Sequence, residues 1–137
     1  KAKHMIRDCK LIAERNNVRF KFNSYFPIRS LNLMRGVLVA EEDNFKSYYI
    51  DNIFDAIWQD GLNMNDDNII LKVLKNLNIN PKTFALRATS SSIKDSLKKR
   101  TAEAYEKGIF GAPTFVSNNK LFWGQDRIEF VLKEASK

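Results

Sequence analysis

The sequence predicts an α/β protein that is mostly helical and ends in an antiparallel hairpin followed by a last helix. Apolar residues recur at helical spacing through most of residues 3–107. Two β-prone runs, 114–116 and 120–122, then flank Ser117-Asn118-Asn119, whose asparagines tolerate the positive φ that hairpin turns require. Residues 125–132 resume helical spacing, with Ile128, Val131 and Leu132 expected to face inward.

The first predicted element is an amphipathic helix over residues 3–15, whose apolar stripe includes Met5 and Cys9. Cys9 is the only cysteine, which excludes a disulfide or a Cys-x-x-Cys pair within these 137 residues. Its place on the apolar stripe predicts a buried, unreactive thiol. His4 has no second ligand one turn away, so no metal site is expected there. Residues 18–22 alternate apolar and basic side chains, which is typical of an extended segment with one buried face.

An all-helical block is predicted between residues 30 and 88. Ser30 and Asp66 are suited to cap the starts of two of its helices, and Pro81 is suited to the first turn of another. The helices and their expected inward residues are 30–40 (Leu31, Met34, Val37, Leu38), 44–59 (Phe45, Tyr49, Ile53, Ile57), 66–77 (Ile69, Ile70, Val73, Leu74) and 81–88.

A longer polar helix is predicted over residues 92–107. Ser92 followed by Asp95 fits a capping box, and Gly108 is a natural C-terminal cap. Glu103 lies four residues after Lys99 and three residues after Arg100, which indicates a solvated, internally paired face. The residues expected to face inward are Ile93, Leu97, Ala104 and Tyr105.

The positive charge is concentrated at the start of the chain. Residues 1–35 hold nine Lys and Arg and two acidic residues, a balance of +7, whereas residues 36–137 hold fourteen of each sign and balance to zero. A solvated helix face and a surface for small anionic ligands are both open interpretations, whereas nucleic acid binding lacks a supporting motif. The sequence contains no apolar run long enough to span a membrane and no signal-peptide pattern, so a cytoplasmic protein is expected.

Two short motifs near the end of the chain carry the chemistry. Gln125 and Asp126 open the last helix, where backbone N–H groups bind anions and a carboxylate can accept from an ammonium group. Together they match the head group of an α-amino acid, although Asp126 alone could simply cap its helix. Ala112-Pro113 precedes the first strand, and residue type alone favours a trans bond there. Trp123 is open to two interpretations, core residue or pocket wall.

The order helix, Gly-Ala-Pro turn, hairpin and helix resembles the C-terminal half of a thioredoxin fold. Within that superfamily, Gly108-Ile-Phe-Gly-Ala-Pro-Thr-Phe and Phe122-Trp-Gly-Gln-Asp-Arg resemble the 2-hydroxychromene-2-carboxylate isomerases and the kappa-class glutathione transferases. The resemblance covers the whole chain. It implies a thioredoxin-like α/β fold with a large all-helical insertion, and an N-terminal βαβ portion that would precede Lys1. On this basis residues 1–29 lead into the insertion, 30–107 form the insertion and the returning helix, and 108–137 form the C-terminal ββα half.

The resemblance also implies a site. The Ala112-Pro113 bond would be cis, and the Ala112 backbone would pair with the cysteinyl part of glutathione as in strand addition. Gln125 and Asp126 would hold the γ-glutamyl end, and Lys1 would lie near the glycine end or the substrate carboxylate. The catalytic serine, which holds the glutathione thiolate, is expected before Lys1, so no catalytic residue is assigned in this chain.

The intact protein is therefore expected to be a glutathione-dependent isomerase or transferase acting on a small aromatic carboxylate, as a homodimer. Residues 1–137 alone are expected to be inactive. Because a two-stranded hairpin is marginal by itself, its free edge is expected to pair with another copy or to leave the chain poorly stable. Two alternatives remain open: a DsbA-type thiol–disulfide oxidoreductase whose Cys-x-x-Cys precedes Lys1, and a non-catalytic module that binds through the basic first quarter.

Overall fold

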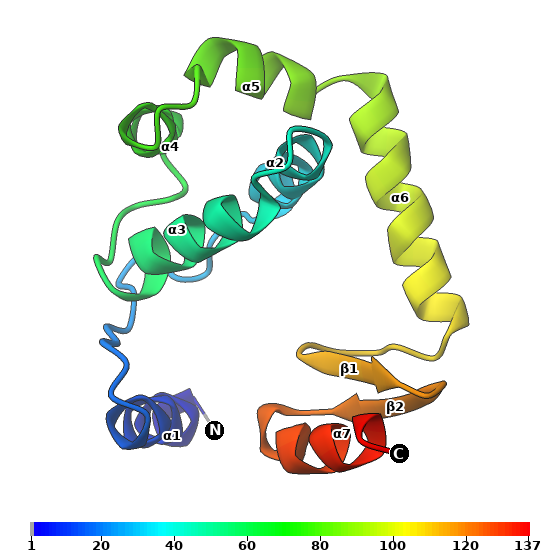
Figure 1. The fold of residues 1–137 in the computed structure, drawn as a ribbon. Helices are drawn as coiled ribbons and strands as arrows, with labels where there is room; N and C mark the ends of the chain where they lie inside the picture. The colour runs from blue at the N-terminus through cyan, green and yellow to red at the C-terminus, as the bar shows by residue number, and fades with distance from the viewer. Residues whose placement is uncertain (1) are drawn as a thin grey trace. The chain divides into compact units, whose positions relative to one another are not determined.

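The computed structural model describes residues 2–137 (Figure 1). The chain forms two compact units that are divided between Leu97 and Lys98. The described chain is mostly helical, and its one sheet has two strands. Each predicted helix of residues 3–107 is present with ends within two residues of those expected. The elements of the first unit are α1 (Ala2–Arg15), α2 (Leu31–Glu42), α3 (Lys46–Trp58), α4 (Asp67–Asn76), α5 (Pro81–Ala88) and the start of α6 (Ser91–Glu106). The second unit contains the rest of α6, β1 (Thr114–Ser117), β2 (Lys120–Trp123), the 3-10 helix η1 (Gln125–Arg127) and α7 (Ile128–Ala135).

The core of the first unit lies where α2, α3 and α5 pack together. Tyr49 is only 2% exposed, and the four-residue spacing predicted for α3 is confirmed at Ile53 and Ile57, which are also buried. The expected inward face of α2 is partly wrong, because Leu31 and Met34 are 56% and 49% exposed. Since α2 is apolar on most sides, spacing alone did not select its buried face. The buried residues of α2 are Leu33, Gly36, Leu38, Val39 and Ala40.

The segment between α1 and α2 donates hydrogen bonds to the last carbonyl groups of α3 and does not join a sheet. The last carbonyl groups of a helix have no partner within the helix. Here residues 18–23 supply donors for two of them, and the fully buried side chain of Asn23 is satisfied on both its nitrogen and its oxygen. The bonds run from Lys21 N–H to Trp58 O (2.6 Å), from Asn23 Nδ2–H to Ile57 O and to Leu62 O (2.9 Å each), and from Tyr25 N–H to Asn23 Oδ1 (2.8 Å).

Two of the three predicted start signals in the helical block behave as expected. Asp66 accepts a hydrogen bond from the Asn68 N–H group at 2.8 Å, and Pro81 is the first residue of α5. Ser30 directly precedes α2 but makes no side-chain cap bond, because its backbone already has helical φ and ψ. The position of this helix start was therefore right, and its proposed capping interaction was wrong.

The start of α6 also differs in detail from the prediction. Ser92 lies inside the helix, and the Ser90 hydroxyl oxygen accepts from the Ile93 N–H group at 3.4 Å instead. Four consecutive residues, Thr89 to Ser92, can all cap a helix, so the sequence did not single out one start. Tyr105 was expected to face inward but is almost fully exposed. Gly108 ends the helix with a φ of 81°, as predicted.

Cys9 is exposed, which corrects the prediction of a buried thiol. Met5 and Ile12, on the same predicted stripe, are exposed as well, because an amphipathic pattern does not show whether another element covers the apolar face. Cys9 and Met5 line an open hollow of about 440 Å³ whose other walls include Phe22 and Trp58.

The second unit is built on the predicted hairpin. Asn118 and Asn119 have φ values of 48° and 59°, which form the turn, and Phe115 pairs with Phe122 across the strands. Helix α7 packs on the hairpin (Figure 1). The buried Glu134 of α7 forms ion pairs with Lys120 of β2 at 2.9 Å and with Lys137 at 2.7 Å.

Several apolar side chains of the second unit remain exposed. Val116 and Leu121 face each other across the strands and are both largely accessible. Ile128 and Leu132 were expected to face inward, and this expectation was wrong because both are exposed. A sheet of two strands offers α7 too small a surface to cover its whole apolar stripe.

Candidate functional site

The hairpin brings the two predicted recognition motifs to one of its ends. Thr114 at the start of β1 pairs with Trp123 at the end of β2. Just beyond this pair, the Gly124 N–H group donates to the Pro113 carbonyl oxygen at 3.0 Å. Ala112-Pro113 and Gln125-Asp126 are therefore neighbours in space, although eleven residues or more separate them in sequence.

The Ala112-Pro113 peptide bond is cis, as the resemblance predicted. The turn that contains it is held by a hydrogen bond from the Thr114 hydroxyl group to the Gly111 carbonyl oxygen at 2.6 Å. Ala112 itself is exposed. Ala112 lies two residues before β1, and an exposed residue close to an edge strand is accessible to an extended peptide.

Trp123 forms a wall beside this turn. Its indole lies against Gly111, where an added Cβ atom would be 2.8 Å from Nε1, and its ring centroid is 5.0 Å from that of Phe110. The side chain remains 55% exposed, which favours the wall over the core interpretation. Gly111 was not singled out from the sequence, because its role depends on a contact with a residue on the other strand.

Asp126 lies in η1 with its side chain 64% exposed. Gly124, with a φ of 110°, allows this arrangement, because an added Cβ atom there would be 2.5 Å from Asp126 Oδ1. Arg127 Nη2 lies 3.6 Å from Asp126 Oδ2, so η1 presents an acidic and a basic group side by side. Such a pair can meet the ammonium and carboxylate groups of an α-amino acid. Gln125 is exposed at the same helix start.

The other predicted groups contribute less. Lys1 lies outside the described residues. Two arginines of the basic first quarter already have partners in the first unit: Arg19 forms an ion pair with Asp60 at 2.6 Å, and Arg29 donates to the Asn65 carbonyl oxygen at 3.2 Å. Across residues 2–137, no group of three or more His, Cys, Asp or Glu side chains is placed to hold a metal ion. In the same residues, no helix has both the length and the apolar character needed to cross a membrane.

A model of the DSBA-like thioredoxin domain matches residues 1–135, so the chain belongs to that family. Within it, the chain is a distant homologue of 2-hydroxychromene-2-carboxylate isomerases. It is 24% identical over 131 residues to the isomerase of Sphingobium xenophagum, 28% identical over 87 residues to that of Pseudomonas sp. (strain C18), and 23% identical over 128 residues to that of Pseudomonas putida.

These matches cover most of this chain but only part of each relative. They span 96%, 64% and 93% of the chain, and 66%, 41% and 62% of the three isomerases in the same order. A solved structure of a 2-hydroxychromene-2-carboxylate isomerase superimposes with a TM-score of 0.86 at 21% identity, over 98% of this chain and 65% of that protein. The chain therefore has the fold of about two thirds of that isomerase structure.

Proposed function

We propose that the intact protein is a glutathione-dependent isomerase of the 2-hydroxychromene-2-carboxylate type. The observation that carries the proposal is the homology to named isomerases over nearly the whole chain. The substrate would be a small aromatic carboxylate. Residues 30–107 would form a helical insertion in a thioredoxin-like domain, and the catalytic serine would belong to the part of the relatives that these 137 residues do not match.

The residues present in the second unit fit one side of a glutathione site. The exposed Ala112 would pair its backbone with the cysteinyl part of the tripeptide. The Asp126 carboxylate would accept from the γ-glutamyl ammonium group, while the Gln125 N–H group and the Arg127 side chain favour the adjacent carboxylate. Trp123 would close the side of the site next to the turn. When bound, glutathione would supply the reactive thiol.

Calorimetric titration with glutathione tests this assignment. We expect Asp126→Asn to weaken binding about tenfold, because a hydrogen bond between charged groups is lost while the side-chain size is kept. Glu129→Gln is the matched control, since it removes the same charge from an exposed position on the following helix and should leave affinity within about twofold. Equal affinities of the Asp126→Asn variant and the unaltered protein would remove Asp126 from the site.

An activity measurement separates the proposed isomerase from its rival. Isomerisation of 2-hydroxychromene-2-carboxylate should depend on added glutathione and be reduced in Asp126→Asn. The DSBA-like family assignment keeps a thiol–disulfide oxidoreductase as the second candidate. Catalysed reduction of a protein disulfide, with no isomerisation at any glutathione concentration, would favour that candidate and overturn ours.

A further inference from the structure

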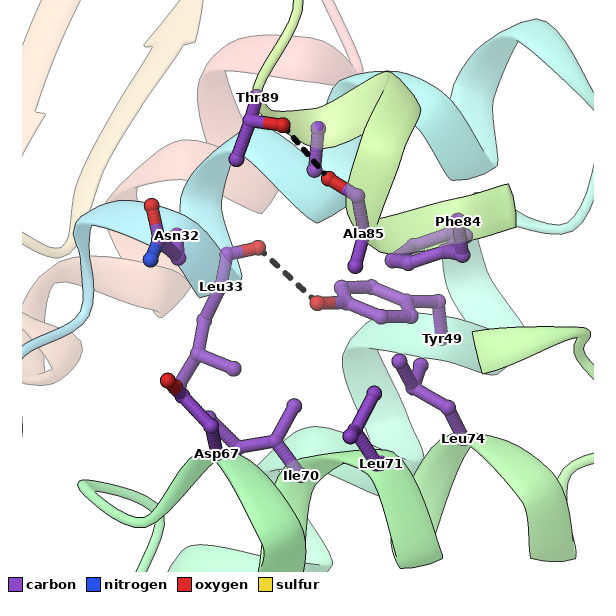
Figure 2. A pocket seen from close by; sticks show the side chains of 11 residues that line it. Asn32, Leu33, Tyr49, Asp67, Ile70, Leu71, Leu74, Phe84, Ala85 and Thr89 are labelled. Atoms are coloured by element: carbon purple, nitrogen blue, oxygen red, sulfur yellow. Dashed lines mark hydrogen bonds between the residues drawn. The ribbon is translucent and has the colours of Figure 1, made fainter. Parts of the chain in front are cut away.

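The first unit contains a pocket that the proposed function does not use. Helices α2, α3, α4 and α5 surround a cavity of about 290 Å³ (Figure 2). This volume is just below the range of about 300–1,000 Å³ that is usual for small-molecule sites. Its walls are mainly aliphatic and aromatic, formed by Leu33 of α2, Tyr49 of α3, Ile70, Leu71 and Leu74 of α4, and Phe84 of α5.

The aromatic wall of this pocket is held in place by three contacts. The Tyr49 hydroxyl group donates to the Leu33 carbonyl oxygen at 3.1 Å, and its ring centroid is 5.3 Å from that of Phe84. Gly36 provides the space behind it, because an added Cβ atom would lie 2.8 Å from Tyr49 Cζ. Burial raises the pKa of Tyr49, so its hydroxyl stays neutral at physiological pH.

These contacts make the interior suited to an apolar body. The one polar atom of the Tyr49 side chain is already bonded to the protein, as the dashed line in Figure 2 shows. A water molecule needs two to four polar partners to be held in a cavity. The interior side chains Leu33, Leu74 and Phe84 provide none. An apolar ligand is therefore favoured there over water.

The polar residues of the pocket lie at its opening. Asn32, Asp67 and Thr89 line it and are all exposed. The Thr89 hydroxyl group donates to the Ala85 carbonyl oxygen at 3.0 Å, and Asn32 Oδ1 accepts from Arg35 at 3.0 Å, so both are engaged within the chain.

Asp67 is the one charged residue that lines the pocket. Helix α4 is capped by the preceding Asp66, which leaves the Asp67 carboxylate without a capping role. A carboxylate at the opening of an apolar pocket complements a ligand with one positive charge.

We propose that this pocket binds a small apolar amine, with its hydrocarbon body between Tyr49 and Leu74 and its ammonium group on the Asp67 carboxylate. The volume suits a ligand on the order of ten non-hydrogen atoms, such as two fused rings or a branched chain. For a ligand of that size, a dissociation constant on the order of 0.1 mM is expected. The site is built from residues of the first unit alone, so it does not depend on the glutathione assignment.

A second hollow beside the pocket contains a positive charge, so comparing a cationic with an anionic ligand tests the proposal. Arg29 lines that hollow together with Asp67 and Asn32. Its guanidinium group donates to the Asn65 carbonyl oxygen, which holds it on the α3–α4 connection. If Arg29 dominated the opening, an anion with the same hydrocarbon body would bind better than the amine.

The test uses two probes with the same rings and opposite charge, 2-naphthylmethylamine and 2-naphthoate, titrated into the isotope-labelled chain at neutral pH. Backbone amide shifts give the affinity and the location together. We expect the amine to shift residues of α4 and α5 around the pocket and to bind at least fivefold more tightly than naphthoate. Equal or tighter binding of naphthoate, or shifts confined to other residues, would overturn the proposal.

Three variants locate the site. Ala85→Leu should weaken amine binding more than tenfold, because the Ala85 methyl group points toward Tyr49 (Figure 2) and a larger side chain fills the pocket. Leucine is a strong helix former and Ala85 is exposed, so α5 should still fold. Asp67→Asn should weaken amine binding about threefold, as expected for one exposed ion pair.

Asp51→Asn on α3 is the matched control, since it removes the same charge from an exposed residue outside the pocket and should change nothing. Unchanged amine affinity in Ala85→Leu, checked for native circular dichroism, would refute the pocket as the binding site. If that variant does not fold, the shift map of the unaltered chain decides.

Discussion

Asn23 should be a main determinant of the stability of the first unit, although it lies outside every helix. Its fully buried side chain joins the segment after α1 to the last turn of α3 and to Leu62 beyond it. Asn23→Ala removes two donors and one acceptor at once. The Ile57 carbonyl group and the Tyr25 N–H group then lose this partner, while the Leu62 carbonyl group keeps its bond from the Met64 N–H group at 2.9 Å.

The size of the effect follows from how buried these groups are. A buried polar group without a partner costs about 1–3 kcal/mol, and a typical hydrogen bond contributes about 0.5–1.5 kcal/mol. The bond to Ile57 is buried and the other two are partly buried. Taking the first near about 2 kcal/mol and the others near about 0.5 kcal/mol each, Asn23→Ala should lower the free energy of unfolding by about 3 kcal/mol. For a chain of this length, that corresponds to a fall in Tm of about 10 °C.

Urea unfolding followed by far-ultraviolet circular dichroism measures this loss. The control is Asn52→Ala, whose side chain donates to the Tyr48 carbonyl oxygen at 2.8 Å on an exposed helix surface. That change should alter the free energy of unfolding by less than about 0.5 kcal/mol. Similar midpoints for the two variants would refute the role of Asn23 at the end of α3.

Asn23→Asp adds a test that depends on charge. The carboxylate would still accept from the Tyr25 N–H group, but it would face two carbonyl oxygens without a proton to donate. We expect it to be at least as destabilising as Asn23→Ala at neutral pH. The loss should become smaller as the pH falls and the carboxyl group gains a proton. A loss that does not change with pH would contradict this reasoning.

Two further predictions concern the packing of α2 and the charge of α7. Gly36→Ala should destabilise by about 2 kcal/mol in urea unfolding, although this substitution normally stabilises a helix, because the new methyl group meets the Tyr49 ring; a gain in stability would show that the ring can move aside. Hydrogen bonds from Lys137 and Lys120 lower the pKa of Glu134 from its ordinary value of 4.5 to about 2. Its contribution to stability is therefore fully present above pH 4.5 and is lost as the pH falls toward 2. Glu134→Gln should remove that part of the acid dependence and Glu129→Gln should keep it, so identical acid profiles for Glu134→Gln and the unaltered chain would contradict the assignment.

The candidate site was predictable where its signals are local. Ala112-Pro113 and Asp126 stand in short motifs that resemble one family, and the structure brings the two motifs together at one end of the hairpin. The contact between Gly111 and Trp123 was not predictable in the same way, because the two residues lie on different sides of the turn and approach only when the strands pair. Their one signal in the sequence is a glycine before Ala-Pro and an aromatic residue at the end of the second strand.

The burial of individual side chains was harder to predict than the elements that carry them. In α2, residues on several sides are apolar, and the choice between Leu31 and Leu33 depends on where the Tyr49 ring packs. Cys9 lies on the apolar face that the spacing predicts, yet it is exposed. Periodicity describes one helix at a time, whereas burial requires a second element at the right distance.

The sequence by itself determined the approximate extent of each helix and where the chain turns. Asp66, Pro81 and the two asparagines of the hairpin act on neighbouring backbone groups, so their effects are readable within a few residues. Only the tertiary structure decided which groups hydrogen-bond to the end of α3 and which helices enclose the pocket beside Tyr49. Those features join groups that are about 16 to 40 residues apart, and such contacts form only once the intervening helices have packed.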